Sequence, residues 1–420
     1  MNTRFVILVV LILLTASNLS AATQIPPENR PGDQLTPVVF FPGFGGTRLK
    51  VTVHRQTVAP ECPRSGTFEY GGLVDPGPDF NQICRDKLLT LVYHAGTKPQ
   101  FSEQRGVKVT IANYGEVGSA IPLFEPFFAF LESHGYQRNV NLRVAGYDFR
   151  LTPDMDGFVK RTMGLIEETY RANHNTPVHL VAHSNGPVYA QYLLTHTTQR
   201  WKNKYIHGFT PVGGNWPGGG WGYILLFTGL DVPTFSYPAD PVAAASSAAM
   251  YQSHPSTYLL AADPAYFRDQ EVVIRDASTS TNYTPQDYQQ LFADAGLSLA
   301  QEIAPYYFGP AQFLPPNFPY VDVYAEMGSG LETLVGIEVP DLQVGQPFGN
   351  ALSFFTRDGD SSNEDITNDA IRVWDAMSCY HFEINDNPGV DHVSLILASP
   401  AVQNRLLVHL QQPRSQCPRP

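Results

Sequence analysis

The feature that most constrains the fold of this chain is a serine between a short apolar run and a helical segment. Val178–Val181 is a largely apolar, β-branched run that predicts a buried strand, and Pro187–Leu194 predicts a helix opened by a first-turn proline. The intervening Ala182–Gly186 (AHSNG) has the small flanking residues that a tight strand-to-helix turn requires. The pattern predicts a nucleophile elbow, with the Ser184 hydroxyl projecting from the sheet and the Asn185 N–H facing a developing oxyanion. A serine in an ordinary loop is the alternative.

The first residues predict a secretory signal peptide over residues 1–22. Arg4 provides a positive charge, Phe5–Leu14 is an unbroken apolar run, and Ser20–Ala22 offers small residues for cleavage. The apolar run is too short for a bilayer-spanning helix, although an uncleaved anchor is the alternative. We therefore expect residues 23–420 to form a soluble protein that is secreted or resides in the lysosomal lumen.

The four cysteines fit an oxidising compartment. Four cysteines allow three pairings, of which we favour the two that are local in sequence, Cys62 with Cys84 and Cys379 with Cys417. Buried free thiols are the alternative. The sequon at Asn282 predicts a glycosylation site.

The charge balance argues against nucleic acid as a partner. The chain has 27 basic and 39 acidic residues, a net charge of −12, and no basic run. Charged residues make up only 16% of the chain and aromatic residues 12%, which leaves room for apolar surface at a lipid interface or for a large core. No histidine and cysteine spacing suggests zinc, and no glycine motif suggests a phosphate, so we expect chemistry without a metal or a cofactor.

Strand-like and helix-like segments alternate along the chain, which predicts a mostly parallel α/β sheet. Strands are expected at Val38–Phe41, Leu142–Gly146, Phe209–Gly214, Tyr320–Glu326 and Cys379–Ile384, and helices at Pro126–His134, at Gly157–Ala172 and from Ser399 onward. On the second helix, the expected apolar face carries Val159, Met163, Ile166 and Tyr170. Residues 53–98 look irregular and residues 215–319 have weak periodicity, so both are predicted to be insertions, the second a cap over the site.

A nucleophilic serine needs a base and a carboxylate that orients the base. After an elbow, the chain order is serine, acid, histidine. Of the late histidines, His381 lies in an expected strand, His409 lies on the last helix, and His392 follows a loop at Asn385–Gly389. His392 is therefore the predicted base, with an ordinary loop histidine as the alternative.

The acid is expected in the polar loop after the late strand. Asp358 and Asp360 both lie there, and their spacing does not decide between them. The second oxyanion donor is expected in the glycine-rich loop after the first strand, where the Phe44 N–H is the candidate.

Several motifs in this order resemble the family of lecithin:cholesterol acyltransferase and lysosomal phospholipase A. They are Val38–Gly43, Gly146–Arg150, Ala182–Gly186, Asp358–Asp360 and Asp391–Val393, together with Asn282–Asp294, which resembles the cap of that family. The likeness runs through nearly all of the chain after the signal peptide.

The resemblance implies an α/β-hydrolase fold with Ser184 as nucleophile, Asp360 as acid and His392 as base, and with the N–H groups of Phe44 and Asn185 as oxyanion hole. It implies that the Cys62–Cys84 bridge closes a membrane-binding insertion at residues 53–98. It also implies that the cap at residues 215–319 carries a lid near Pro233–Tyr251.

The activity that the resemblance implies is phospholipid acyl hydrolysis or acyl transfer at a membrane or lipoprotein surface. Water or a lipid alcohol such as a sterol would accept the acyl group. Three departures stand out: Phe44 replaces a cysteine or aspartate, Asn185 replaces an apolar residue, and Asp360 is followed by Ser361–Asn363. A secreted carboxylesterase on small soluble esters and a catalytically inactive lipid-binding protein remain the alternative functions.

Overall fold

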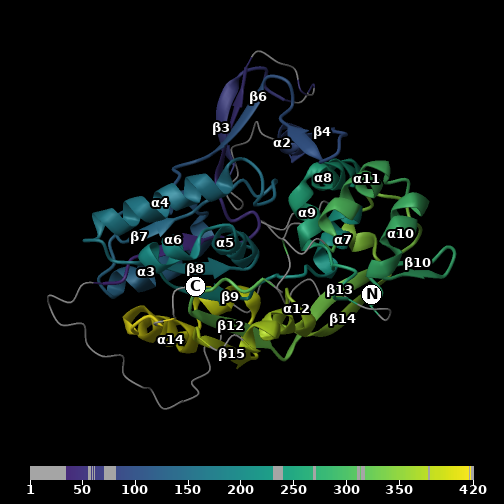
Figure 1. Ribbon diagram of the computed structural model, residues 1–420. Coiled ribbons are helices and arrows are strands. Elements are labelled where there is room, and N and C mark those ends of the chain that lie inside the picture. Colours follow the sequence, from purple (N-terminus) through teal and green to yellow (C-terminus); the bar gives the residue numbers. More distant parts are fainter. Residues whose placement is uncertain are drawn as a thin grey trace. The chain divides into compact units, whose positions relative to one another are not determined.

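A six-stranded parallel sheet lies at the centre of the computed structural model, with the strand order β15-β12-β9-β8-β1-β7 (Figure 1). The strands are β1 Val38–Phe41, β7 Leu142–Val144, β8 Val178–His183, β9 Ile206–Val212, β12 Val323–Ser329 and β15 Phe382–Pro388. The structure describes residues 35–54, 58, 60, 62–70, 82–229, 240–267, 271–309, 313, 317–376, 379–415 and 417. The predicted signal peptide at residues 1–22 lies outside the described residues.

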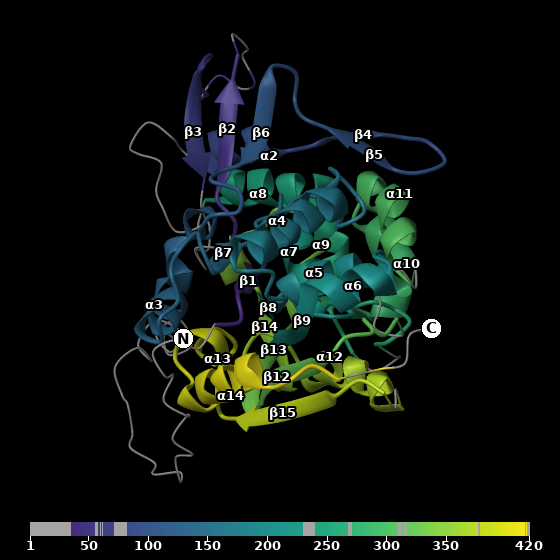
Figure 2. The same ribbon diagram turned by 60° about the vertical axis from the view of Figure 1, so that its left-hand side comes forward.

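Both faces of the central sheet are covered by helices, which explains why β1 and β8 are buried at every position. Val38 and Phe40 point to the face covered by α3 (Glu125–Ser133), α13 (His392–Leu397) and α14 (Pro400–Gln411). Val39 and Phe41 alternate to the face covered by α4 (Phe158–Ala172), α5 (Gly186–Thr195) and α6 (Gln199–Tyr205), an arrangement that can be followed in Figure 2. The expected α/β architecture is therefore confirmed.

The buried face of α4 is displaced by one residue from the predicted one. Phe158, Thr162, Leu165 and Thr169 are buried together with Ile166, whereas Val159, Met163 and Tyr170 are only partly buried. The prediction gave no weight to threonine. Thr169 can face the core because its hydroxyl donates to the Leu165 carbonyl oxygen at 2.8 Å. This bond within the helix gives the buried threonine hydroxyl a partner.

The last two sheet strands begin later than predicted. Tyr320 has a φ of +55° and lies outside β12, which begins at Val323. The predicted loop at Asn385–Gly389 is mostly strand, because β15 pairs with β12 as far as Pro388. The Asn387 side chain supports this pairing by donating to the Met327 carbonyl at 2.9 Å.

The chain between β1 and β7 contains regular structure, so the prediction of an irregular stretch at residues 53–98 was wrong. A three-stranded antiparallel sheet has the order β3-β2-β6, and a β4-β5 hairpin lies beside it. Its elements are β2 Leu49–Val53, β3 Gly66–Tyr70, α2 Gln82–Leu89, β4 Val92–His94, β5 Gln100–Ser102 and β6 Val107–Ile111. These strands pair with one another rather than with the central sheet, and several of them are too short to show a clear pattern in the sequence.

The chain between β9 and β12 is mainly helical. Its elements are α7 Gly220–Thr228, α8 Pro241–Ser253, α9 Pro255–Leu260, β10 Ile274–Asp276, β11 Thr281–Tyr283, α10 Tyr288–Asp294 and α11 Ser298–Tyr307. The strands β10 and β11 join β13 (Leu331–Val339) and β14 (Ser353–Gly359) in a mixed sheet of order β11-β10-β13-β14. Of the predicted lid, Pro233–Tyr251, residues 233–239 lie outside the described part and Pro241–Tyr251 belongs to α8.

Short helical turns complete the elements of the described chain. They are η2 Val117–Ser119, η3 Pro122–Phe124, η4 Pro285–Asp287, η5 Phe348–Asn350, α12 Asp365–Asp369 and η6 Ala370–Ala376. Within the residues that the structure describes, we find no helix with the length and apolar character needed to cross a membrane.

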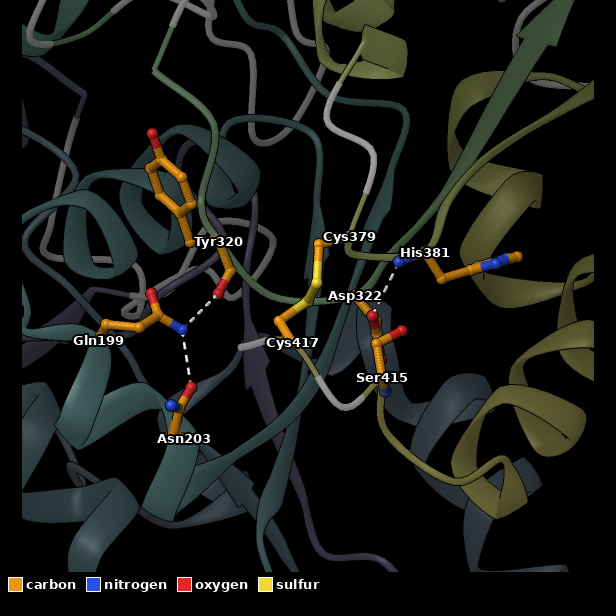
Figure 3. The surroundings of a disulfide bond; sticks show 8 residues. All are labelled: Gln199, Asn203, Tyr320, Asp322, Cys379, His381, Ser415 and Cys417. Carbon is orange, nitrogen blue, oxygen red and sulfur yellow. Dashed lines mark hydrogen bonds between the residues drawn. A yellow bond between two sulfur atoms is a disulfide. The ribbon is translucent and has the colours of Figure 1, made fainter. Parts of the chain in front are cut away.

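Two disulfides join the expected cysteine pairs, Cys62 with Cys84 and Cys379 with Cys417. The second bridge attaches the C-terminal tail beside the start of β12 (Figure 3). There the Asp322 carboxylate accepts hydrogen bonds from the backbone N–H groups of His381 at 2.9 Å and Ser415 at 2.7 Å. Bridge and carboxylate together hold the tail against the segment that leads into β15.

Candidate active site

Ser184 lies in a tight turn between β8 and α5, as the sequence predicts. Its φ is +63°, a left-handed conformation that a serine rarely adopts and that marks a strained turn. A Cβ at Gly186 would lie 2.4 Å from the Phe41 carbonyl oxygen, so only glycine allows α5 to start this close to β1. The turn places Ser184 at the carboxyl edge of the sheet, where open α/β sheets bind ligands.

The loop after β1 passes directly over Ser184. A Cβ at Gly43 would lie 2.8 Å from the Ser184 Cβ and 3.2 Å from its Oγ. The next residue, Phe44, is half-buried, and its ring centroid lies 5.5 Å from that of Phe149 and 6.2 Å from that of Tyr251. The backbone of the glycine-rich loop is thus brought close to the serine hydroxyl.

His392 and Asp360 form a buried pair at the same edge of the sheet. His392 Nδ1 lies 2.8 Å from Asp360 Oδ2, and the His392 N–H donates to the Asp360 carbonyl at 2.8 Å. The other carboxylate oxygen, Oδ1, accepts from the N–H groups of Ser362 at 3.0 Å and Asn363 at 2.5 Å. Asp360 is 0% exposed and His392 is 6% exposed, so bulk water does not compete for these bonds.

The structure distinguishes between the acids and histidines that the sequence left open. Asp360 contacts His392, whereas Asp358 lies beside Asp365; burial and this neighbouring carboxylate raise the pKa of Asp365 to about 6. His381 Nε2 lies 3.1 Å from a Glu383 oxygen, and His409 Nε2 lies 3.9 Å from the same atom. The described contacts therefore bring only one of the candidate acids to one of the candidate bases.

Gly213 contacts the pair and was missed by the sequence reasoning. It has a φ of +54°, and a Cβ there would lie 2.9 Å from His392 Nδ1 and 3.4 Å from Asp360 Oδ2. The Asn363 side chain donates to the Gly213 carbonyl at 2.8 Å, which joins the end of β9 to the acid loop. The available signal was the Gly213–Gly214 pair directly after a buried strand.

His183 was also missed, although it precedes the serine. Its Nε2 donates to the His392 carbonyl at 2.9 Å, and its ring centroid lies 4.7 Å from that of His392. Burial, and secondarily the neighbouring His392, lowers the pKa of His183 to about 3. His183 therefore remains neutral at physiological pH and adds no charge beside His392.

Ser184 and His392 line one cavity whose walls are mainly apolar. The buried His392 Nε2 has no hydrogen-bond partner among the described residues, whereas Nδ1 contacts Asp360. The apolar lining residues are Phe44, Ile121, Leu123, Phe124, Trp221, Leu225, Leu260 and Val393, and the polar ones are His183, Ser184, Asn215, Ser362, Asn363 and His392. A substrate with a long apolar part fits such a lining better than a small polar one.

Two further predicted residues have contrasting environments. Asn185 is fully buried at the start of α5, and its amide atoms have no partner among the described residues. Asn282 is exposed on β11, where a glycan could be accommodated. In the described part of the chain, we also find no group of three or more His, Cys, Asp or Glu side chains placed to hold a metal ion.

The parallel sheet, the serine turn after β8 and the buried His–Asp pair at the carboxyl edge define an α/β-hydrolase fold. A solved structure agrees with this fold: the crystal structure of the Tle4–Tli4 complex aligns with a TM-score of 0.53 and 12% sequence identity, covering 89% of this chain and 98% of that chain.

Within this class, sequence comparison finds similarity to one family. The family model for lecithin:cholesterol acyltransferase matches residues 108–308. The phosphatidylcholine-sterol acyltransferase of Rattus norvegicus is 24% identical over 90% of this chain and 87% of its own length. The lysosomal phospholipase A and acyltransferase of Mus musculus is 26% identical over 87% of this chain and 88% of its own length. The resemblance to the lecithin:cholesterol acyltransferase and lysosomal phospholipase A family is thereby confirmed.

Proposed function

We propose that this chain is a phospholipid acyl hydrolase and acyltransferase that works through an acyl-enzyme on Ser184. The observation that carries the proposal is the 2.8 Å contact between His392 and Asp360, in a mainly apolar cavity shared with Ser184. The relatives named as a sterol acyltransferase and as a phospholipase A and acyltransferase support the choice of a phospholipid as acyl donor.

In the first half-reaction, His392 Nε2 takes the proton of the Ser184 hydroxyl while Oγ attacks the ester carbonyl carbon. The resulting oxyanion is stabilised by the N–H groups of Phe44 and Asn185. The intermediate collapses, the acyl group stays on Ser184, and the lysophospholipid leaves with the proton from His392. Water or a lipid alcohol then attacks the acyl-enzyme by the same steps, which releases a fatty acid or a new ester and restores the serine.

Asp360 keeps His392 in the tautomer that this reaction needs. The Nδ1–H donates to the carboxylate, so the neutral ring presents an unprotonated Nε2 towards the cavity. As His392 becomes positively charged in the transition state, the buried carboxylate stabilises that charge. The three hydrogen bonds that Asp360 accepts from backbone N–H groups and His392 keep the carboxylate in place.

The other sequence predictions belong to the same proposal. Residues 1–22 would be cleaved on secretion, and the protein would act outside the cell or in the lysosomal lumen, with a glycan on Asn282. The insertion at residues 53–98, closed by the Cys62–Cys84 bridge, would dock on a membrane or lipoprotein surface, and residues 215–319 would cap the site. The two disulfides and the exposed Asn282 are consistent with such a compartment.

The deciding experiment combines active-site labelling with product analysis. A fluorophosphonate probe is expected to label Ser184 in the folded protein, and phosphatidylcholine vesicles are expected to yield lysophospholipid, with fatty acid alone or with sterol ester when a sterol is present. Hydrolysis of dispersed short-chain esters without any turnover on vesicles would instead indicate a soluble-ester carboxylesterase. A folded protein that is not labelled would indicate an inactive lipid-binding protein.

A further inference from the structure

Helix α8 presents an unusually smooth surface to its neighbours. From Ala243 to Ala249 every side chain is alanine or serine. The end of α7 approaches it so closely that a Cβ at Gly229 would lie 2.3 Å from the Ala244 carbonyl oxygen and 2.7 Å from the Ser247 Cβ. Helices normally resist sliding because large side chains interlock in ridges and grooves. The small side chains of α8 interlock little with neighbouring helices. Apolar packing alone therefore holds α8 only weakly at one position along its axis.

Hydrogen bonds add to this specification: the Gln252 amide of α8 donates to the Leu226 carbonyl of α7 at 2.9 Å, and further bonds join α8 to α2 and the residues after it. The Ser247 hydroxyl donates to Asp86 Oδ2 at 2.6 Å and accepts from Gln82 Nε2 at 2.7 Å. Six residues later on α8, the Ser253 hydroxyl accepts from the Leu91 N–H at 3.0 Å. These contacts join the two segments at two points along the helix axis. Figure 2 shows α8 running beside α2.

The central group of this junction is a fully buried carboxylate. Asp86 is 0% exposed and is paired with the neighbouring Arg85, whose Nη2 lies 2.8 Å from Asp86 Oδ1. Burying an ion pair adds little to stability, since well-packed apolar residues of similar volume often do as well or better. The hydrogen bond from Ser247 to Asp86 has a separate effect, because its geometry favours one axial position of α8 over positions shifted along the axis.

The axial position of α8 matters to the site because Tyr251 lies one helical turn beyond Ser247. Tyr251 is 2% exposed, and its ring centroid lies 6.2 Å from that of Phe44 in the loop over the serine. A slip of one residue along α8 would move Tyr251 by about 1.5 Å, and displacements of this size in a catalytic site can cost on the order of a hundredfold in rate.

We propose that Asp86 and Ser247 are positioning residues for the reaction. Their hydrogen bond fixes the register of α8 along α2, and thereby sets Tyr251 against Phe44 and holds the Phe44 N–H where the oxyanion forms. The inference rests on the proposed function, since it assigns the Phe44 N–H to the oxyanion hole. The inference assigns to Asp86 and Ser247, which are remote from the reacting atoms, an effect on kcat rather than on substrate binding.

The test compares Ser247→Ala with Ser246→Ala. Ser246 is a matched control because its buried hydroxyl has no hydrogen-bond partner among the described residues. On a dispersed short-chain ester, with active sites counted by fluorophosphonate labelling, Ser247→Ala is expected to lower kcat by about tenfold to a hundredfold with little change in KM. Ser246→Ala is expected to retain the kcat and KM of the unmodified protein. A Ser247→Ala protein with unchanged kcat per active site, even with a lower melting temperature, would overturn the inference.

A second comparison tests the route through Tyr251. Tyr251→Leu is expected to lower kcat, and adding Ser247→Ala to it is expected to cause no further loss, because both changes release the same contact. Independent, multiplying losses would show that Ser247 does not act through Tyr251 and would also overturn the inference. A failure of the proposed function looks different, because the unmodified protein itself would then hydrolyse no ester and take up no probe.

Discussion

His392 Nδ1 lies 2.8 Å from Asp360 Oδ2, and the opposite ring nitrogen has no hydrogen-bond partner in the described part of the chain. The backbone reinforces the pair, since the His392 N–H donates to the Asp360 carbonyl at 2.8 Å. A histidine held on one side by a buried carboxylate and unengaged on the other is poised to accept a proton.

Ser184→Ala is expected to abolish acyl transfer and leave the fold intact. The substitution removes the nucleophile, a loss on the order of a millionfold in kcat where single triad residues have been removed from a serine hydrolase. Circular dichroism and the melting temperature check folding, and product analysis on phosphatidylcholine vesicles measures the activity. Turnover by a pure Ser184→Ala protein would exclude the proposed mechanism.

Asp360→Asn is expected to impair catalysis far more than Asp358→Asn. The first change removes the charge that orients His392, and the corresponding change in a well-studied triad costs about ten-thousandfold in kcat. Asp358 lies instead beside Asp365, so its neutralisation leaves the His392 contact in place. The measurement is kcat on a soluble ester for both variants, and the reverse ranking would contradict the assignment of the acid.

Gly213→Ala is expected to lower activity by displacing His392, because the new Cβ would lie 2.9 Å from Nδ1. Gly296→Ala is the matched control. Gly296 also has a left-handed φ, +69° against +54° at Gly213, but a Cβ there would meet nothing within 4 Å. Both variants are expected to lose about 1 kcal/mol or more of stability to backbone strain. Only the first is expected to lose kcat, and equal kcat in the two variants would argue against the contact.

Replacing Cys62 and Cys84 by serine is expected to weaken vesicle binding more than hydrolysis of a dispersed short-chain ester. The bridge spans 22 residues of sequence. By lowering the conformational entropy of the unfolded chain, a bridge of this span adds roughly 3 kcal/mol to the free energy of unfolding. It encloses apolar residues, of which Tyr70 is buried, Phe68 and Ile83 are half-buried, and Leu73, Val74 and Phe80 lie outside the described residues.

The tail bridge provides the control for this experiment. Replacing Cys379 and Cys417 by serine removes a bridge that spans 38 residues, so it should lower the melting temperature without a selective effect on vesicles. Vesicle co-sedimentation and soluble-ester turnover are measured on both double variants. Parallel losses of both activities in the Cys62 and Cys84 variant would show that the first bridge serves only folding.

The stability of the fold is expected to decrease as pH rises from about 4.5 towards 9, in part through Glu364. Burial, and then the neighbouring Glu271, raises the pKa of Glu364 from 4.5 to about 9, while Arg357 opposes the shift. The folded state therefore binds a proton that the unfolded state has released in this range. The stabilisation is fully present below the unfolded pKa and is lost as pH rises through the folded pKa.

Glu364→Gln removes this titration while keeping a side chain of the same shape. The urea midpoint of the unmodified protein is expected to fall with pH more steeply than that of Glu364→Gln between pH 4.5 and 9. Parallel profiles for the two proteins would show that Glu364 does not carry the proton.

The sequence predicted the elements whose signals are local. Val38–Phe41 and Gly186–Thr195 lie where the apolar runs and the helix-opening proline indicated, because strand burial and helix initiation depend on neighbouring residues. The ends of β12 and β15 were predicted less well, because pairing with a neighbouring strand determines how far a strand continues. The short strands between β1 and β7 were missed for the same reason.

The sequence by itself determined the α/β class, the serine turn and a set of candidate acids and bases, because each depends on patterns within a few residues. Only the tertiary structure decided that Asp360 rather than Asp358 contacts His392, and that Gly213 and His183 contact the same ring. Asp360 and His392 are 32 residues apart and meet only because the end of β14, in the mixed sheet, lies beside the start of α13, which follows β15 of the central sheet. Such a meeting depends on how the two sheets lie against each other, which no local pattern encodes.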